Sequence, residues 1–127
     1  ICMGSTAGTV KTVVDQLRAE GVKAGVLRLR AYRPLPAQNI VDALKNVKAI
    51  AVVDRSHSFG ALGSPMFHEM RHVFYDASTH PHLVNYIYGL GGRDMPPNLI
   101  NEIYQDLLKI VRTNRAEKLV QFIGVRE

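Results

Sequence analysis

Apolar residues recur along this chain with two periods, one typical of α-helices and one typical of β-strands. Four stretches have helical spacing, in which side chains three and four residues apart share one face. Ser5 or Thr6 can cap the first of these helices, and Gly21 favours a left-handed stop at its end. The last helix is predicted over roughly residues 97–113. The four apolar faces consist of Val10, Val13, Val14 and Leu17; Ile40, Val41 and Leu44; Met66, Phe67, Met70, Val73 and Phe74; and Leu99, Ile100, Ile103, Leu107 and Ile110.

Short apolar runs of strand length lie between these helices. Residues 49–53 form a continuous apolar run, which is typical of a parallel strand covered on both faces. Residues 23–29 and 83–88 are also predicted to be strands, and residues 1–3 the end of a strand that begins outside the sequence. Strands alternating with helices predict an α/β fold, a three-layer α/β/α sandwich with a mostly parallel sheet. The length of 127 residues fits a single domain over residues 1–127.

Composition excludes several classes of protein. No apolar run approaches the ~20 residues that cross a bilayer, so no membrane partner is expected. The net charge is +5, but the 16 lysines and arginines are scattered and form no nucleic-acid-binding motif, so no nucleic acid is expected. Cys2 is the only cysteine, which rules out an internal disulfide and a cysteine metal site. A reducing cytoplasm is the expected location.

One candidate for ligand binding is the turn of Gly4, Ser5, Thr6, Ala7 and Gly8 at the start of the first helix. Backbone N–H groups there could hold a phosphate. The spacing matches neither a Walker loop nor a dinucleotide fingerprint, and basic residues, Arg28 and Arg30, stand where a ribose-binding acid would follow the second strand. A tight turn with a helix cap is the favoured interpretation, with a phosphate or nucleotide site as the alternative.

A second candidate is His68-Glu69-Met70-Arg71-His72, which matches the H-E-x-x-H pattern of zinc metalloproteases. The apolar residues of this helix point one way, and both histidines point almost the opposite way. We therefore expect at most an adventitious surface pair of His68 and His72, and no metal site. No carboxylate pair or nucleophile elbow is present either, so the sequence predicts no catalytic residue.

Glycine and proline motifs, in a fixed order along the chain, carry a family resemblance. They occupy residues 4–11, 28–36, 52–65 and 122–127, and the most specific one is V-N-Y-I-Y-G-L-G-G-R-D at residues 84–94. Together they resemble the carboxy-terminal, transketolase-like domain of the α subunit of pyruvate:ferredoxin oxidoreductases, within the 2-oxoacid:ferredoxin oxidoreductase family. His68 departs from the pattern of that family.

The resemblance implies a role inside a larger enzyme that oxidatively decarboxylates pyruvate to acetyl-CoA and reduces ferredoxin. Thiamine diphosphate and iron–sulfur clusters would belong to other parts of that complex, with CoA as co-substrate and no cofactor in this domain. Implied partners are the other α-subunit domains, the β, γ and δ subunits, ferredoxin through the complex, and a second copy of the multisubunit unit.

The expected role of this domain is assembly, and an isolated domain would be inactive. We predict an apolar docking tail at residues 118–127 and contacts through Tyr86, Tyr88, Arg93, Asp94, Phe122 and Ile123. Two alternatives remain at this stage: an enzyme acting on another 2-oxo acid, and a free-standing domain that binds a phosphorylated ligand of the CoA type through Gly4, Ser5, Thr6 and Gly8.

Overall fold

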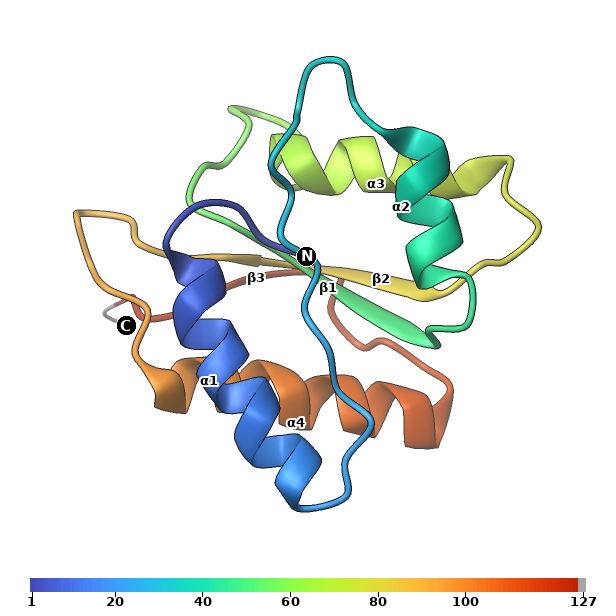
Figure 1. Ribbon diagram of the computed structural model, residues 1–127. Helices are drawn as coiled ribbons and strands as arrows, with labels where there is room; N and C mark the ends of the chain where they lie inside the picture. The colour runs from blue at the N-terminus through green and yellow to red at the C-terminus, as the bar shows by residue number, and fades with distance from the viewer. Residues whose placement is uncertain (126–127) are drawn as a thin grey trace.

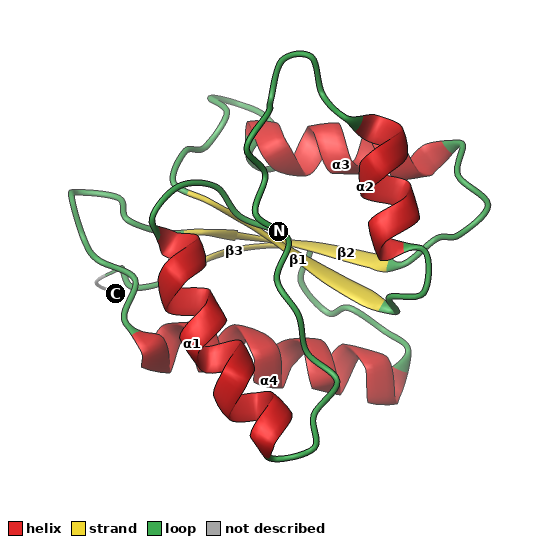
Figure 2. Ribbon diagram, viewed as in Figure 1, coloured by secondary structure: helices red, strands yellow, loops and turns green. Residues whose placement is uncertain are grey.

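The computed structural model describes residues 1–125 and shows a parallel β-sheet between two layers of helices (Figures 1 and 2). Strands β1, β2 and β3 lie side by side in chain order, and both pairs are parallel. Helices α1 and α4 cover one face, and α2 and α3 cover the other. The elements are α1 (Thr6–Ala19), α2 (Ala37–Leu44), β1 (Ala49–Asp54), α3 (Pro65–Tyr75), β2 (His82–Ile87), α4 (Pro97–Thr113) and β3 (Val120–Phe122). The predicted α/β fold with a parallel sheet is confirmed.

Local signals set the ends of the helices. Gly21 has a positive φ of 85°, and the N–H of Val22 bonds back to the C=O of Leu17 at 3.0 Å, which closes α1 where the sequence predicted. At the start of α3 the Ser64 hydroxyl accepts a 3.3 Å bond from the N–H of Phe67, and Pro65 occupies the first turn. Helix α4 ends at Asn114, whose φ of 55° is left-handed.

The sheet separates two apolar cores. One lies between the sheet and helices α1 and α4. It contains most of the apolar face of each helix, together with Ala51, Val53, Val84, Tyr86 and Tyr88. The other lies between the sheet and helices α2 and α3 and contains Ile40, Ile50, Val52, Met66, Phe67, Met70 and Phe74. A fully buried side chain of this size contributes roughly 1.5–3 kcal/mol. Both cores therefore depend on β1, whose alternate residues point into each of them.

Two predicted strands are much shorter in the structure. Residues 1–3 and 23–29 form one isolated parallel bridge, Cys2 to Arg28, with bonds from the N–H of Cys2 to the C=O of Leu27 and from the N–H of Leu29 to the C=O of Cys2. The strand prediction for residues 23–26 is wrong for the described chain, because Ile1 and Cys2 supply backbone partners only from Leu27 onward. The segment passes the edge of the sheet beside β1 on its way from α1 to α2 (Figure 1).

The tail also differs from its prediction. Residues 120–122 form β3, which pairs with β2 through a 2.7 Å bond from the N–H of Asn85 to the C=O of Leu119 and a 3.0 Å bond from the N–H of Ile123 to the C=O of Ile87. The apolar tail thus docks on its own sheet, where strand pairing satisfies its backbone groups. Residues 126–127, the last two of the predicted docking tail, lie outside the described residues.

Candidate functional site: the carboxyl edge of the sheet

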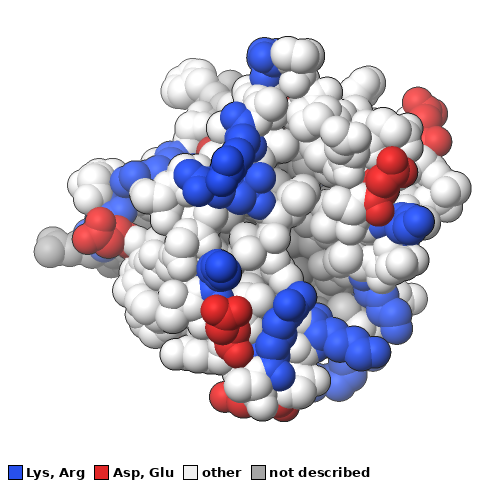
Figure 3. All heavy atoms as spheres, viewed as in Figure 1, with Lys and Arg blue, Asp and Glu red and all other residues white. Residues whose placement is uncertain are grey.

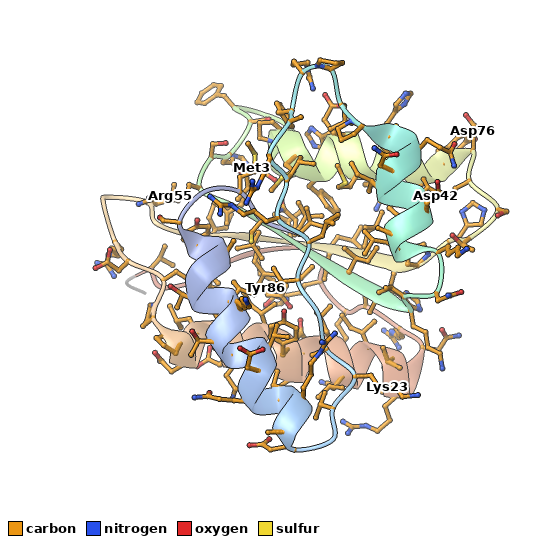
Figure 4. The ribbon with its side chains drawn as sticks, viewed as in Figure 1. Met3, Lys23, Asp42, Arg55, Asp76 and Tyr86 are labelled. Atoms are coloured by element: carbon orange, nitrogen blue, oxygen red, sulfur yellow. The ribbon has the colours of Figure 1, made fainter. Side chains whose placement is uncertain are left out.

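Parallel strands bring their following loops to one edge, and this is where open α/β sheets place ligand and partner contacts. Here the turn at residues 4–5, the loop at 55–64, the loop at 88–96 and residues 123–125 all lie at the carboxyl ends of the strands. Figure 4 shows Arg55 at this end of the molecule and Lys23 toward the opposite end. We call these four segments the carboxyl edge.

A buried polar network fixes the loop at residues 55–64. The side-chain oxygen of Asn85 accepts a 2.8 Å bond from the N–H of Ser64, and its amide donates to the C=O of Val52 at 3.0 Å. Asn85 and Ser64 are both fully buried. At the two ends of the loop, Asp54 accepts bonds from the N–H groups of Ser56 and Met66. Because buried polar groups are costly when unpaired, the bonds of Asn85 hold the Ser64 end of the loop in place. The exposed bond from Ser56 to Asp54 lies at the other end.

The loop at residues 88–96 packs closely on its neighbours. Gly89 has a φ of +72°, and a Cβ there would lie 2.8 Å from the Nε of Arg55. The Arg55 guanidinium lies 5.6 Å from the centre of the Tyr88 ring, and Arg93 donates a 2.9 Å bond to the C=O of Gly124. Glycine at position 89 thus allows the arginine to lie across the loop, and Arg93 joins the loop to the tail.

The carboxyl edge presents large apolar side chains to solvent. Phe59 lies in the turn closed by the bond from the N–H of Ala61 to the C=O of Ser58, and Leu62 follows this turn. Their side chains are 105% and 87% exposed. Phe122, the last residue of β3 and next to this edge, is 47% exposed, and its ring lies 5.4 Å from that of His57 in the 55–64 loop. Exposed apolar side chains grouped on one surface mark sites where another protein binds. The sequence analysis missed Phe59 and Leu62, although two large apolar residues among Gly60, Gly63 and polar neighbours were the available signal.

The loops of the carboxyl edge also carry two basic residues. Arg55 and Arg93 are exposed, and the ion pairs found within residues 1–125 are Arg33 with Glu69 and Lys109 with Glu117. On the face shown in Figure 3, basic side chains outnumber acidic ones, in keeping with the net charge of +5. An acidic surface would complement the edge.

The glycine turn at residues 4–8 has a structural explanation. The Thr6 hydroxyl is buried and bonds the Tyr88 hydroxyl, and the N–H groups of Ala7 and Gly8 bond back to the C=O groups of Gly4 and Ser5. Gly4 has a φ of +69°, which a glycine accommodates. These bonds use the N–H groups of Ala7 and Gly8 within the turn itself. The free-standing phosphate-binding alternative is therefore not favoured.

The H-E-x-x-H segment lies on the outer side of α3. Met66, Phe67 and Met70 point into the core, while His72 is exposed, His68 is partly exposed, and Glu69 pairs with Arg33. Within residues 1–125, no three His, Cys, Asp or Glu side chains lie together in a group that could hold a metal ion. The arrangement gives no support to protease chemistry.

The predicted interface residues fall into two groups. Tyr86 and Tyr88 are 3% and 4% exposed, so within this chain they belong to the core and offer little surface to a partner. Tyr86 lies between the sheet and the layer of α1 and α4 (Figure 4). Its hydroxyl donates to Asp106 of α4, and burial together with this bond raises the pKa of Tyr86. Arg93, Asp94 and Phe122 are exposed and Ile123 is partly exposed, so these four remain candidates.

Comparison with known proteins assigns the chain to a protein family. Residues 1–100 match the family model for pyruvate:ferredoxin oxidoreductase core domain II, so the chain belongs to this family. Among its relatives, the ketoisovalerate oxidoreductase subunit VorA of Pyrococcus furiosus is 44% identical over 93% of this chain and 30% of its own length. The pyruvate synthase subunits PorA of Thermotoga maritima and Methanosarcina barkeri are 36% and 37% identical over the whole chain and 31% of their own lengths.

The chain thus spans about a third of the length of these relatives. The resemblance drawn from the glycine and proline motifs is confirmed at the level of the family. Within residues 1–125, none of the helices is long and apolar enough to cross a bilayer.

Proposed function

We propose that this chain is an assembly domain of a multisubunit 2-oxoacid:ferredoxin oxidoreductase, in which the carboxyl edge binds a neighbouring domain or subunit. The observation that carries the proposal is the pair Phe59 and Leu62, both fully or nearly fully exposed on a loop whose end at Ser64 is fixed by a buried hydrogen bond to Asn85. A preorganised loop with apolar anchors binds with little loss of conformational entropy. Aromatic and arginine side chains together are typical of energetically dominant interface residues.

The proposed complex oxidatively decarboxylates a 2-oxo acid to an acyl-CoA and reduces ferredoxin. Its implied groups are thiamine diphosphate and iron–sulfur clusters, with CoA as co-substrate. The donor set of this chain does not fit an iron–sulfur cluster, which needs several thiolates, because Cys2 is its only cysteine and is buried. Burial also raises the pKa of the Cys2 thiol, which opposes formation of a thiolate. We therefore assign no catalytic step to residues of this chain.

Pyruvate is the proposed substrate, and another 2-oxo acid is the alternative. The relatives include subunits named for pyruvate synthase and for ketoisovalerate oxidoreductase, so similarity alone does not choose between them. The proposed partners are the remaining α-subunit domains, the β, γ and δ subunits, and ferredoxin through the complex. We also propose that residues 1–127 form a single domain of a cytoplasmic enzyme.

The test is anaerobic purification of the protein that contains this chain, carrying an affinity tag, from its source cells. Co-purifying subunits would be identified, and reduction of a viologen dye would be measured with pyruvate, 2-oxoisovalerate and CoA. The proposal predicts further subunits and dye reduction that requires both a 2-oxo acid and CoA. A protein that purifies alone and reduces no dye under these conditions would contradict the proposal.

A further inference from the structure

A long apolar groove lies along the edge of β1 that does not pair with β2. It has a volume of about 1050 Å³ and runs between the outer edge of β1 and the segment at residues 21–27. Ile1 and Cys2 line its end near the middle of the sheet, where the N-terminus lies in Figure 1. Figure 3 looks onto this face, which is hollowed to the right of centre.

One wall of the groove is a strand edge with unpaired backbone groups. Backbone groups at even positions of β1 face β2, as the bonds from the N–H of His82 to the C=O of Lys48 and from the N–H of Tyr88 to the C=O of Asp54 show. Groups at odd positions face the groove. Val53 donates to the C=O of Ile1 at 2.9 Å, and Ala51 accepts from the Ile1 nitrogen at 2.6 Å. The N–H of Ala51, which also faces the groove, has no backbone partner within the described residues.

The opposite wall is paired in the same register. The N–H of Cys2 bonds the C=O of Leu27 at 3.1 Å, and the N–H of Leu29 bonds the C=O of Cys2 at 2.9 Å. Ile1 and Cys2 therefore already lie as a parallel strand between the two walls. Both walls continue past Ile1, since β1 begins at Ala49 and the other segment extends back to Lys23.

This register specifies what would fit the groove. Continuing the strand backward from Ile1, successive residues would lie opposite Ala51, Ile50, Ala49 and Lys48 on one side and Val26, Gly25, Ala24 and Lys23 on the other. Four residues of extended chain span ~13 Å. These four residues would pair with residues 23–26, which were predicted to be part of a strand but form no strand pairing in the described chain.

The groove also specifies the side chains of its occupant. Cys2 points into the core between the sheet and helices α1 and α4. Ile1 packs against the core between the sheet and helices α2 and α3. Residues continuing this alternation would meet Ile103 and Leu107 on one side and Leu44 on the other. Because both sides are apolar, every position favours an apolar residue, as in a parallel strand covered on both faces.

We propose that the groove seats a parallel β-strand made by about four apolar residues joined directly to Ile1 in a longer polypeptide, since this chain spans about a third of the length of its relatives. The sheet would then have five strands, with residues 23–29 at one edge and β3 at the other. The buried Ile1 nitrogen fits this assignment, since desolvation lowers the pKa of its amino group and a peptide N–H there would donate the same bond without a charge. This inference does not depend on the proposed function.

The test is hydrogen exchange on the longer natural polypeptide, comparing its own sequence with a variant in which the four residues before Ile1 are replaced by Gly-Ser-Gly-Ser. We expect exchange in peptides covering residues 24–29 and 49–53 to be at least about tenfold faster in the variant, and exchange in α3 to change little. Equal exchange of the groove peptides in both proteins would overturn the proposal.

A second comparison covers the case in which that variant fails to fold. The 127-residue chain would be extended before Ile1 by Val-Ile-Val-Val or, as a matched control, by Gly-Ser-Gly-Ser. The proposal predicts slower exchange of the Ala51 and Leu27 amides and a higher melting temperature for the apolar extension only, both independent of protein concentration. Protection that appears only at high concentration would mean that a second copy supplies the strand, and would contradict the proposal.

Discussion

The N–H of Ser64 donates a 2.8 Å hydrogen bond to the side-chain oxygen of Asn85, which joins the start of α3 to β2. Neither residue is accessible to solvent. The same Asn85 side chain holds the C=O of Val52 in β1, so a single amide connects two strands and the loop that carries Phe59 and Leu62. The exposed edge therefore depends on a buried polar group.

Replacing Asn85 by alanine should be strongly destabilising. The change leaves the N–H of Ser64 buried without its partner, which costs about 1–3 kcal/mol, and the cavity adds to this cost. The free energy of unfolding would be measured by urea titration. The matched control is Asn101→Ala on the exposed side of α4, where we expect a change within about 0.5 kcal/mol. Similar losses in both variants would refute the role of Asn85.

Alanine should have opposite effects at two glycines. Gly63 has a φ of +129°, and a Cβ there would lie 2.7 Å from Phe67 and 3.0 Å from the side-chain oxygen of Asn85, so Gly63→Ala should cost more than about 1 kcal/mol. Gly8 lies within α1 with open space around it, so Gly8→Ala should stabilise the protein by up to about 1 kcal/mol. Urea titration of both variants tests the pair, and a neutral Gly63→Ala would be inconsistent with this packing.

High pH should destabilise the protein through Tyr104. Burial raises the pKa of Tyr104 to about 12, and its hydroxyl donates a 2.7 Å bond to the C=O of Gly25. The unfolded chain loses this proton near the ordinary pKa of 10.0, before the folded protein does. The stabilising contribution is therefore complete below pH 10 and is lost as pH rises from 10 to about 12.

The measurement is the free energy of unfolding between neutral pH and pH 12, with and without Tyr104→Phe. The variant should be less stable than the original protein at neutral pH and should show a smaller loss at high pH. Tyr75→Phe is the control, because Tyr75 is 79% exposed and should leave the pH profile unchanged. Identical profiles for the original protein and Tyr104→Phe would count against this assignment.

Periodicity predicted the four helices and strand β1 because burial drives their formation. The face formed by Val10, Val13, Val14 and Leu17 is buried as a unit, and the apolar run that forms β1 is covered on both faces. These elements carry their core-facing pattern in their own residues. The family resemblance followed from glycines and prolines whose backbone requirements are similarly local.

Features that depend on distant partners were not predictable in the same way. The tail residues 120–122 become a strand only because β2 offers a free edge, and residues 23–26 lack a ladder because no described strand lies beside them. The burial of Tyr86 and Tyr88 could have been predicted, since they alternate with Val84 on one side of a strand in a predicted three-layer sandwich. Which exposed loop would carry the apolar anchors required the fold itself.

The most direct test of the assembly role is the native mass of the anaerobically purified complex carrying Phe59→Ser and Leu62→Ser. Both side chains are exposed at the carboxyl edge, so the domain should keep its melting temperature, and the matched control Tyr75→Ser changes an exposed aromatic at the far end of α3. If the carboxyl edge binds a neighbouring subunit, we expect the complex with the double variant to lose subunits or dissociate at concentrations where the control complex stays intact. An intact, fully active complex in the double variant would contradict the claim that this edge holds the assembly together.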